Sequence, residues 1–368
     1  MPKRIAILIP HLGIGGAERV SIDLVREFVR RGHAVDFVLM RQRGELLEEV
    51  PEGVGFVDLK AAQLRQVARP LASYLKDRKP DALLANLWPL TSVAIITTKL
   101  IRSRTVIFTV DHSTLSVQYQ DWGWPTWLAL HSTIALIYPF ADGRIAVSHG
   151  VAKDVSALGW RGPDFLDVIF NPVATPAFNQ EAQQAAARAW SGWNGPKLIT
   201  VGTLKEQKDH AMLLRAFKVF LQSRDARLLI LGAGHLFDQT AALARQLGLT
   251  DKVIMPGAFR FPGPFYASAD LFVLSSTHEG LPTVMIEAMA CGIPVASTDC
   301  KSGPAEILEN GRYGLLTPVR DAEALAKAML QSLDSPHARD ALRRRAAEFS
   351  PEKAADKYLE LMFPDHHA

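Results

Sequence analysis

The sequence predicts an α/β protein built from two doubly wound, parallel-sheet domains. Short β-branched runs alternate with longer helical patterns along the 368 residues, and this rhythm pauses near residue 172 before it starts again. Such alternation indicates βαβ units, and a domain usually spans about 100–200 residues. We therefore place one Rossmann-like domain at 1–172 and a second at 173–350. A final helix, at about 351–368, is expected to pack back on the first domain.

The first half opens with a buried-strand pattern at Arg4–Ile9. Helical periodicity follows over Ala17–Arg31, Gly32 ends it, and Ala34–Leu39 is a second strand. Further strands are predicted at Ala82–Ala85, Thr105–Thr109, Arg144–Val147 and Asp167–Ile169.

The second half follows a polar, alanine-rich stretch, Asn179–Ala189, and a turn-rich segment at 191–196, which we interpret as part of the pause. The predicted strands are Lys197–Val201, Arg227–Leu231, Val253–Met255, Leu271–Leu274 and Pro294–Ser297, and Pro351–Met362 is the last helix. Ligands of open parallel sheets bind beyond the carboxyl ends of the strands. We therefore expect the chemistry in the loops after the strands, at a cleft between the two domains.

Composition restricts the class of protein. The net charge is only +3 with 21% charged residues, which disfavours a nucleic-acid binder. Two cysteines are too few for a disulfide framework, and the N-terminal apolar run is too short for a signal peptide. The longest apolar-rich stretch, Trp122–Phe140, falls short of the roughly 20 residues of a membrane span. We expect a cytosolic protein.

Two glycine-containing loops follow predicted strands. Gly13–Glu18, with Gly15 and Gly16, would let backbone N–H groups approach an anion at a helix start, although a tight turn without ligand is the alternative. The pattern lacks the full three-glycine dinucleotide fingerprint, which disfavours an NAD enzyme. Gly202–His210 places Lys205 and Lys208 where they could neutralise a diphosphate. The alternative is that the segment only starts the next helix, with Asp209 as its cap.

The densest motif is Ser275–Glu287. Pro282 suits a first helical position and Gly292 a helix end, so Glu279 precedes the helix and Glu287 lies inside it, on the face of Val284 and Cys291. We expect that face to be buried, which makes an acid there costly unless it is paired. Two such acids suit recognition of a sugar and a ribose. The alternative is a helix N-terminal acid and a solvated one.

These residues resemble the family 4 retaining glycosyltransferases of GT-B fold. The run Glu279-Gly280-Leu281-Pro282, with Glu287 further on, carries the resemblance most clearly. The segments at 289–295, 302–307 and 314–316, the Gly15–Arg19 segment and the Lys208-Asp209 pair agree with it, so the resemblance spans nearly the whole chain.

The resemblance implies a donor site in the second domain. Glu287 would bind the ribose hydroxyls and Glu279 the donor sugar near the reacting centre, while Lys208 pairs with the phosphates. The backbone amides of the segment from Gly280 to Thr283, which includes Leu281 and Pro282, would meet the diphosphate together with the helix N-terminus. Gly15 and Gly16 would close on the diphosphate from the other domain.

Two further positions complete the implied site. The family usually has arginine where this chain has Thr203, so a bidentate phosphate contact is missing there and Lys205 would substitute as a point charge. His112 follows a predicted strand where the family places a histidine, and it would orient the sugar and stabilise developing charge.

The implied reaction is transfer of a hexosyl or N-acetylhexosaminyl group from a nucleotide sugar, by default a UDP-sugar, with retention of configuration. The acceptor would be a saccharide or a lipid-linked glycan of surface polysaccharide or lipopolysaccharide assembly. Lys208, the amides and the helix dipole would stabilise the leaving group, so we expect no metal and no cofactor, and the absence of a metal-ligand spacing in the sequence agrees. A nucleotide-sugar isomerase on the same scaffold and a non-catalytic nucleotide-sugar binding protein are the alternatives.

The acceptor half suggests contact with a membrane. Residues 60–104 carry nine basic and two acidic residues, a net charge of +7, which could meet anionic lipid headgroups on the cytosolic face. The stretch after His112 is aromatic, and Trp and Tyr suit a membrane interface; its members are Tyr119, Trp122, Trp124, Trp127, Tyr138 and Phe140. Solvated helix faces and an aromatic core are the alternative.

Overall fold

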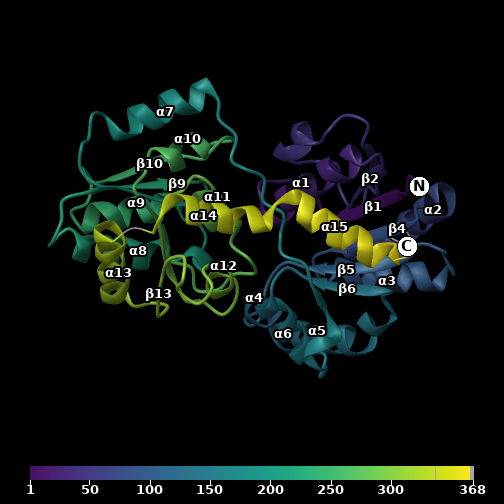
Figure 1. Ribbon diagram of the computed structural model, residues 1–368. Helices are drawn as coiled ribbons and strands as arrows, with labels where there is room; N and C mark the ends of the chain where they lie inside the picture. Colours follow the sequence, from purple (N-terminus) through teal and green to yellow (C-terminus); the bar gives the residue numbers. More distant parts are fainter. Residues whose placement is uncertain (336, 365–368) are drawn as a thin grey trace. The chain divides into compact units, whose positions relative to one another are not determined.

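The protein divides into two compact units, seen in a computed structural model that describes residues 1–335 and 337–364 (Figure 1). One unit contains residues 1–172 and the chain from Ser350 onward, and the other contains Val173–Phe349. The final helix, α15, covers Pro351–Met362. The last positions of the expected helix, 365–368, lie outside the described residues.

The first unit is a seven-stranded parallel sheet in the order β3-β2-β1-β4-β5-β6-β7. Its strands are β1 (Arg4–Ile9), β2 (Ala34–Leu39), β3 (Gly55–Asp58), β4 (Ala82–Asn86), β5 (Val106–Asp111), β6 (Gly143–Ala146) and β7 (Asp167–Val168). Its helices are α1 (Gly16–Arg30), α2 (Ala68–Arg78), α3 (Leu90–Leu100), α4 (Leu115–Gln118), α5 (Trp124–Leu136) and α6 (His149–Leu158), with the short 3₁₀ helix η3 (Tyr138–Phe140) after α5.

The second unit is a six-stranded parallel sheet in the order β10-β9-β8-β11-β12-β13. Its strands are β8 (Lys197–Val201), β9 (Arg227–Leu231), β10 (Val253–Gly257), β11 (Leu271–Leu274), β12 (Val295–Thr298) and β13 (Leu315–Thr317). Its helices are α7 (Gln180–Trp190), α8 (His210–Phe220), α9 (Phe237–Gln246), α10 (Gly263–Ala267), α11 (Thr283–Ala290), α12 (Pro304–Ile307), α13 (Ala322–Asp334) and α14 (Arg339–Ala346).

Both sheets confirm the predicted doubly wound α/β class. In each, the crossovers run outward one way and then reverse, between β1 and β4 in the first unit and between β8 and β11 in the second. Loops that leave the carboxyl ends of two strands at such a switch point diverge to opposite faces and leave room for a ligand. The loops with the candidate residues follow β1, β4 and β5 in one unit and β8 and β11 in the other.

Three elements differ from the sequence-based expectation. The edge strands β3 and β13 were not predicted, because strands of four and three residues carry too little apolar pattern to stand out. The stretch interpreted as part of a pause is the helix α7, which buries Ala182, Ala186 and Trp190 on one face. Its alanines therefore form a helix rather than a linker.

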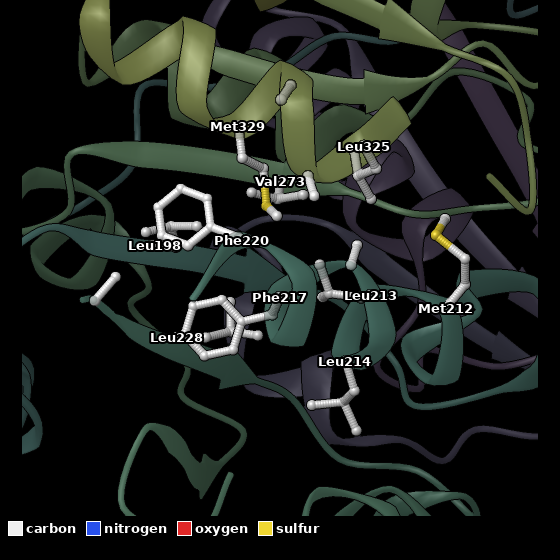
Figure 2. Packing of buried hydrophobic residues seen from close by; sticks show 14 of the residues in the cluster. Leu198, Met212, Leu213, Leu214, Phe217, Phe220, Leu228, Val273, Leu325 and Met329 are labelled. Atoms are coloured by element: carbon white, nitrogen blue, oxygen red, sulfur yellow. The ribbon is translucent and has the colours of Figure 1, made fainter. Parts of the chain in front are cut away.

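The core of the second unit lies between its sheet, α8 and α13. Figure 2 shows the Phe217 and Phe220 rings of α8 among Leu198, Leu228 and Val273, with Met329 of α13 close by. These residues are almost completely buried. Burying one large apolar side chain contributes about 1.5–3 kcal/mol. This packing fixes β8 and β11, and so it holds the loops that follow them.

The last helix, α15, packs against α1 in the first unit. Arg31 joins them, since its guanidinium bonds the Asp356 carboxylate at 2.5 Å and the Glu352 carbonyl at 2.9 Å. Within residues 1–335 and 337–364, no helix has the length and apolar character that crossing a bilayer requires.

Candidate active site

The second unit brings the loops after β8 and β11 together through main-chain and side-chain hydrogen bonds. The Thr277 amide donates to the Gln207 carbonyl at 2.8 Å, and the Ser275 hydroxyl donates to the Lys208 carbonyl at 2.7 Å. Asp209 caps α8 by accepting from the Met212 amide at 3.1 Å, as the sequence suggested. The cap and the loop contacts together hold Lys208 at the switch point of this sheet.

Lys208 and Glu279 form a largely buried ion pair. The Lys208 Nζ atom lies 2.7 Å from Glu279 Oε1, and the two side chains are only 14% and 8% exposed. Glu279 also accepts from the Ser276 hydroxyl at 2.7 Å and from Gln207 Nε2 at 3.2 Å. A carboxylate with three donors is held in one orientation, because each lost contact would leave buried charge uncompensated. The sequence did not predict the contributions of Gln207 and Ser276, although both flank motif residues.

The turn ahead of α11 is shaped by the segment after β12. The Ser302 hydroxyl donates to the Gly280 carbonyl at 2.8 Å. Gly303 lies so close that a Cβ atom would come within 2.4 Å of the Pro282 ring, and its φ of +93° also favours glycine. Pro282 is the residue before the helix rather than its first residue, because α11 begins at Thr283. The first N–H groups of α11 have no acceptors inside the helix, so this turn can offer donors to an anion.

The prediction that Glu287 lies on a buried face is wrong. Glu287 and its neighbours Val284 and Cys291 are half-buried, and α11 instead buries Met285, Ile286, Ala288 and Met289 against the sheet. Larger apolar side chains on the opposite side of the helix determine which face packs. The Glu287 carboxylate accepts a hydrogen bond from the Tyr266 hydroxyl of α10 at 2.9 Å. This phenol orients the acid at the edge of the helix.

The remaining residues of the predicted donor site lie in the loop after β8. Thr203 is exposed and Lys205 is half-buried. Burial lowers the pKa of His278, the charge of Glu279 opposes this shift, and the charges of Lys205 and Lys208 lower the pKa further, so Lys205 lies within electrostatic range of this group. The structure therefore brings Lys208 and Glu279 into contact, sets Lys205 near them, and holds Glu287 separately through Tyr266.

In the first unit, the loop after β1 ends at Gly15, which precedes the first residue of α1, Gly16. A Cβ atom on Gly15 would lie 2.1 Å from Glu18 Oε2, so the glycine makes room for an acid that folds back over the helix start. The loop is further shaped by the Gly13 amide, which donates to His11 Nδ1 at 3.1 Å. The predicted helix start is confirmed to within one residue.

His112 follows β5, and Asn86 at the end of β4 fixes its ring. Asn86 Nδ2 lies 3.2 Å from the carbonyl oxygens of both Leu8 and Leu84, which identifies the amide nitrogen and leaves Oδ1 as an acceptor. That oxygen is 2.8 Å from His112 Nε2, so Nε2 carries the proton. Burial lowers the pKa of His112 to about 4, and its ring is neutral at pH 7. Among the described residues, His112 Nδ1 has no hydrogen-bond partner.

A small cavity adjoins these two side chains inside the first unit. Its lining combines polar groups with aliphatic ones: Ile7, Val20, Ser21, Leu24, Leu84, Asn86, Val110, His112 and Tyr358. Tyr358 comes from α15, so the last helix contributes to the surroundings of His112.

Asp111, beside His112, is a buried acid that sequence reasoning missed. Its Oδ1 accepts from the Tyr138 hydroxyl at 3.0 Å, and Tyr138 in turn lies 3.0 Å from Thr91 Oγ1. Burial raises the pKa of Asp111 to about 7, opposed by the Tyr138 hydrogen bond and assisted by the charge of Asp154. An acid as the last residue of a buried strand is the signal that could have identified it. In the described parts of the chain, no group of three or more His, Cys, Asp or Glu could hold a metal ion.

Comparison with known families covers both halves of the chain. The family described as "Glycosyl transferases group 1" matches residues 186–349, and the one described as "Glycosyltransferase Family 4" matches residues 14–175.

Curated relatives align over nearly the full length. The chain is 27% identical over 364 residues to the N-acetylgalactosamine-N,N'-diacetylbacillosaminyl-diphospho-undecaprenol 4-alpha-N-acetylgalactosaminyltransferase of Campylobacter jejuni, covering 96% of each chain. It is 28% identical over 356 residues to the lipopolysaccharide core biosynthesis glycosyltransferase LpsE of Rhizobium meliloti, covering 95% of this chain and 96% of that protein.

Solved structures share the fold of the whole chain. A glycosyltransferase from Rickettsia africae matches with a TM-score of 0.80 at 19% identity, covering 98% of each chain. Anabaena Alr3699/HepE, solved in complex with UDP-glucose, matches with a TM-score of 0.74 at 21% identity, covering 98% of this chain and 96% of that one. The GT-B fold expected from the sequence is thereby confirmed.

Proposed function

Because the chain belongs to the group 1 glycosyltransferases of GT-B fold, we propose that its donor is a nucleoside diphosphate sugar bound by the second unit. The observation that carries this proposal is the Lys208–Glu279 pair, 2.7 Å apart at the switch point of the sheet. A cation held there can meet a diphosphate, while the acid beside it can accept hydrogen bonds from sugar hydroxyls. UDP-glucose occupies the related Anabaena protein, and a UDP-sugar is our first choice here.

The site residues act together on the leaving group. As the bond between sugar and phosphate breaks, negative charge grows on the diphosphate, and Lys208 with the N–H groups at the start of α11 stabilises it. Lys205 adds positive charge from the same loop. It compensates for the arginine that the family usually has at the position of Thr203. Glu287, oriented by Tyr266, binds the ribose hydroxyls. This use of fixed cations and amides requires no divalent metal.

Residues of the first unit are proposed to act on the same donor. Neutral His112, fixed by Asn86, would orient the donor sugar, and Gly15 and Gly16 would let the helix start of α1 approach the diphosphate. We propose transfer with retention of configuration, through attack of the acceptor hydroxyl on the face from which the nucleotide leaves.

The names of two relatives support a proposal for the acceptor class. The Campylobacter relative is named for an acceptor carried on diphospho-undecaprenol, and the Rhizobium relative for lipopolysaccharide core biosynthesis. We propose that this chain likewise extends a lipid-linked or lipopolysaccharide glycan.

A panel of nucleotide sugars tests the proposal, with thermal shift to detect binding and nucleotide release to detect turnover. One nucleotide sugar should stabilise the protein and release its nucleotide only when acceptor is added, with unchanged rates in EDTA. The anomeric proton coupling of the product, measured by NMR, reports retention or inversion. Conversion of the sugar without nucleotide release would indicate an isomerase, and binding without turnover a sensor; either result would refute transferase activity.

A further inference from the structure

The helix α5 carries an exposed apolar face that the transfer reaction does not use. We define the tryptophan face as Trp124, Trp127, Leu128 and Leu136 of α5 together with Trp160. Each is more than half exposed, from 51% for Leu128 to 76% for Trp124. Large apolar side chains are normal on a surface when scattered singly, whereas a gathered set marks an interaction site.

The composition of α5 is unusual for a surface helix. Trp124–Leu136 contains no Asp, Glu, Lys or Arg. One side is anchored in the first unit, because Leu130 and Ile134 are buried and Trp88 Nε1 donates to Thr133 Oγ1 at 2.9 Å. A helix at the surface of a globular protein ordinarily presents charged residues to water on its other side. Here that side is apolar, so we expect another surface to cover it.

The tryptophan face continues from α5 onto the turn after α6. The His131 ring lies 4.2 Å from Trp127 and 5.4 Å from Trp160, measured between centroids. Trp160 has a φ of +52°, a left-handed backbone that is unfavourable for a bulky residue. Arg161 Nη2 donates to the Ala135 carbonyl at 2.9 Å and ties the turn to α5. The three indoles are therefore presented by a connected and anchored surface.

Basic residues follow helix α3, which contacts η3 beyond the C-terminal end of α5. After α5 comes η3, with exposed Phe140, and the nearby Asp142 is paired with Lys99 at 2.8 Å. Lys99 lies in the last turn of α3, and Arg102 and Arg104, both exposed, follow this helix. Exposed indoles bordered by cations match the boundary of a bilayer with anionic headgroups. A second protein would instead have to leave these cations unpaired or bring acids of its own.

We propose that the tryptophan face docks on the interface of a bilayer that contains anionic lipid. Thirteen helical residues extend only about 20 Å, too short to span the roughly 30 Å hydrocarbon core, so α5 would lie in the plane of the interface. The inference deepens the proposed function, since a docked enzyme meets a lipid-linked acceptor at its headgroup. Docking requires neither donor nor acceptor, so its failure would leave the proposed transfer untouched.

Vesicle co-sedimentation of the full chain tests the proposal. The wild type should bind phosphatidylcholine vesicles containing phosphatidylglycerol, and bind pure phosphatidylcholine more weakly. Trp124→Ser with Trp127→Ser should lower the partition coefficient by about tenfold for each indole. Arg102→Gln with Arg104→Gln should remove most of the preference for anionic vesicles. Phe178→Ser is the control, an aromatic of the second unit that is 51% exposed, close to the 55% of Trp127, and should bind like wild type.

A wild-type measurement keeps the test independent of variant folding. Lipids brominated on their acyl chains should quench the tryptophan fluorescence of the wild type, and the unchanged Tm of each variant confirms its fold. Absence of binding to anionic vesicles would overturn the proposal, as would equal binding by the double-tryptophan variant. A concentration-dependent dimer in lipid-free buffer, abolished by the same substitutions, would assign the face to a second copy and also overturn it.

Discussion

Replacing Lys208 by methionine tests the ion pair that underlies the donor site. The substitution keeps the length of the side chain and removes its charge, leaving Glu279 only 8% exposed with the Ser276 and Gln207 donors. Breaking a buried pair from one side costs about 3–5 kcal/mol. Two remaining donors reduce that cost, and we expect a loss of about 2–3 kcal/mol. For a unit of this size the loss lowers the Tm by roughly 5–10 °C.

A double-mutant cycle separates the structural role of Lys208 from its role toward the diphosphate. Glu279→Gln removes the charge that Lys208→Met leaves unpaired, so the double variant should regain most of the lost Tm. Activity should not return with it, because the cation that stabilises the leaving group is still missing; the Glu279→Gln single variant measures how much of the loss comes from the carboxylate alone. We expect the kcat/KM of nucleotide release to stay about 10²–10³-fold below wild type in the double variant.

Calorimetry and a nucleotide-release assay on the four proteins give both quantities. Lys208→Met with wild-type kcat/KM would refute the assigned phosphate contact. Recovery of activity together with Tm in the double variant would show that transfer needs neither charge, and the reasoning from charge at the leaving group would then fail.

Three further predictions concern the other site residues. Glu287→Gln should raise the KM for the donor about tenfold or more with little change in kcat, because it weakens a charged hydrogen bond to ribose. Tyr266→Phe should raise the KM by a smaller factor. An unaltered KM in both variants would contradict the ribose assignment. Asp111 has a pKa raised to about 7 in the folded protein, so the folded state holds its proton more tightly than the unfolded one and stability falls as pH rises from about 4 through 7. Asp111→Asn should therefore raise the Tm at pH 8 but hardly at pH 4, and an equal effect at both would count against the raised pKa. Asn86→Ala should release the His112 ring, so ¹⁵N NMR should show mixed tautomers in place of Nε2–H. The pKa of His112 should stay low, because burial causes the shift. An unchanged tautomer would show that another group fixes the ring.

Much of the architecture could be predicted from the sequence because it is local. A buried parallel strand is a short β-branched run, and the helix that follows has its own period, so most strands were placed to within one or two residues. The loops with Gly15, Lys208 and Glu279 could be placed after strands for the same reason. The edge strands β3 and β13 and the helix α7 were missed, because their patterns are short or dominated by alanine and polar residues.

By itself, the sequence determined the fold class and the loops that carry the chemistry, because the spacing of apolar residues distinguishes a helix from a strand within each segment. Tertiary structure decided the pairings: Lys208 with Glu279 across 71 positions and Asn86 with His112 across 26. It also decided that the Glu287 face is half-exposed and that the apolar side of α5 faces outward. Such outcomes depend on which elements pack side by side. Crossover connections bring together residues that are far apart in the sequence, and a local sequence pattern contains no information about these contacts.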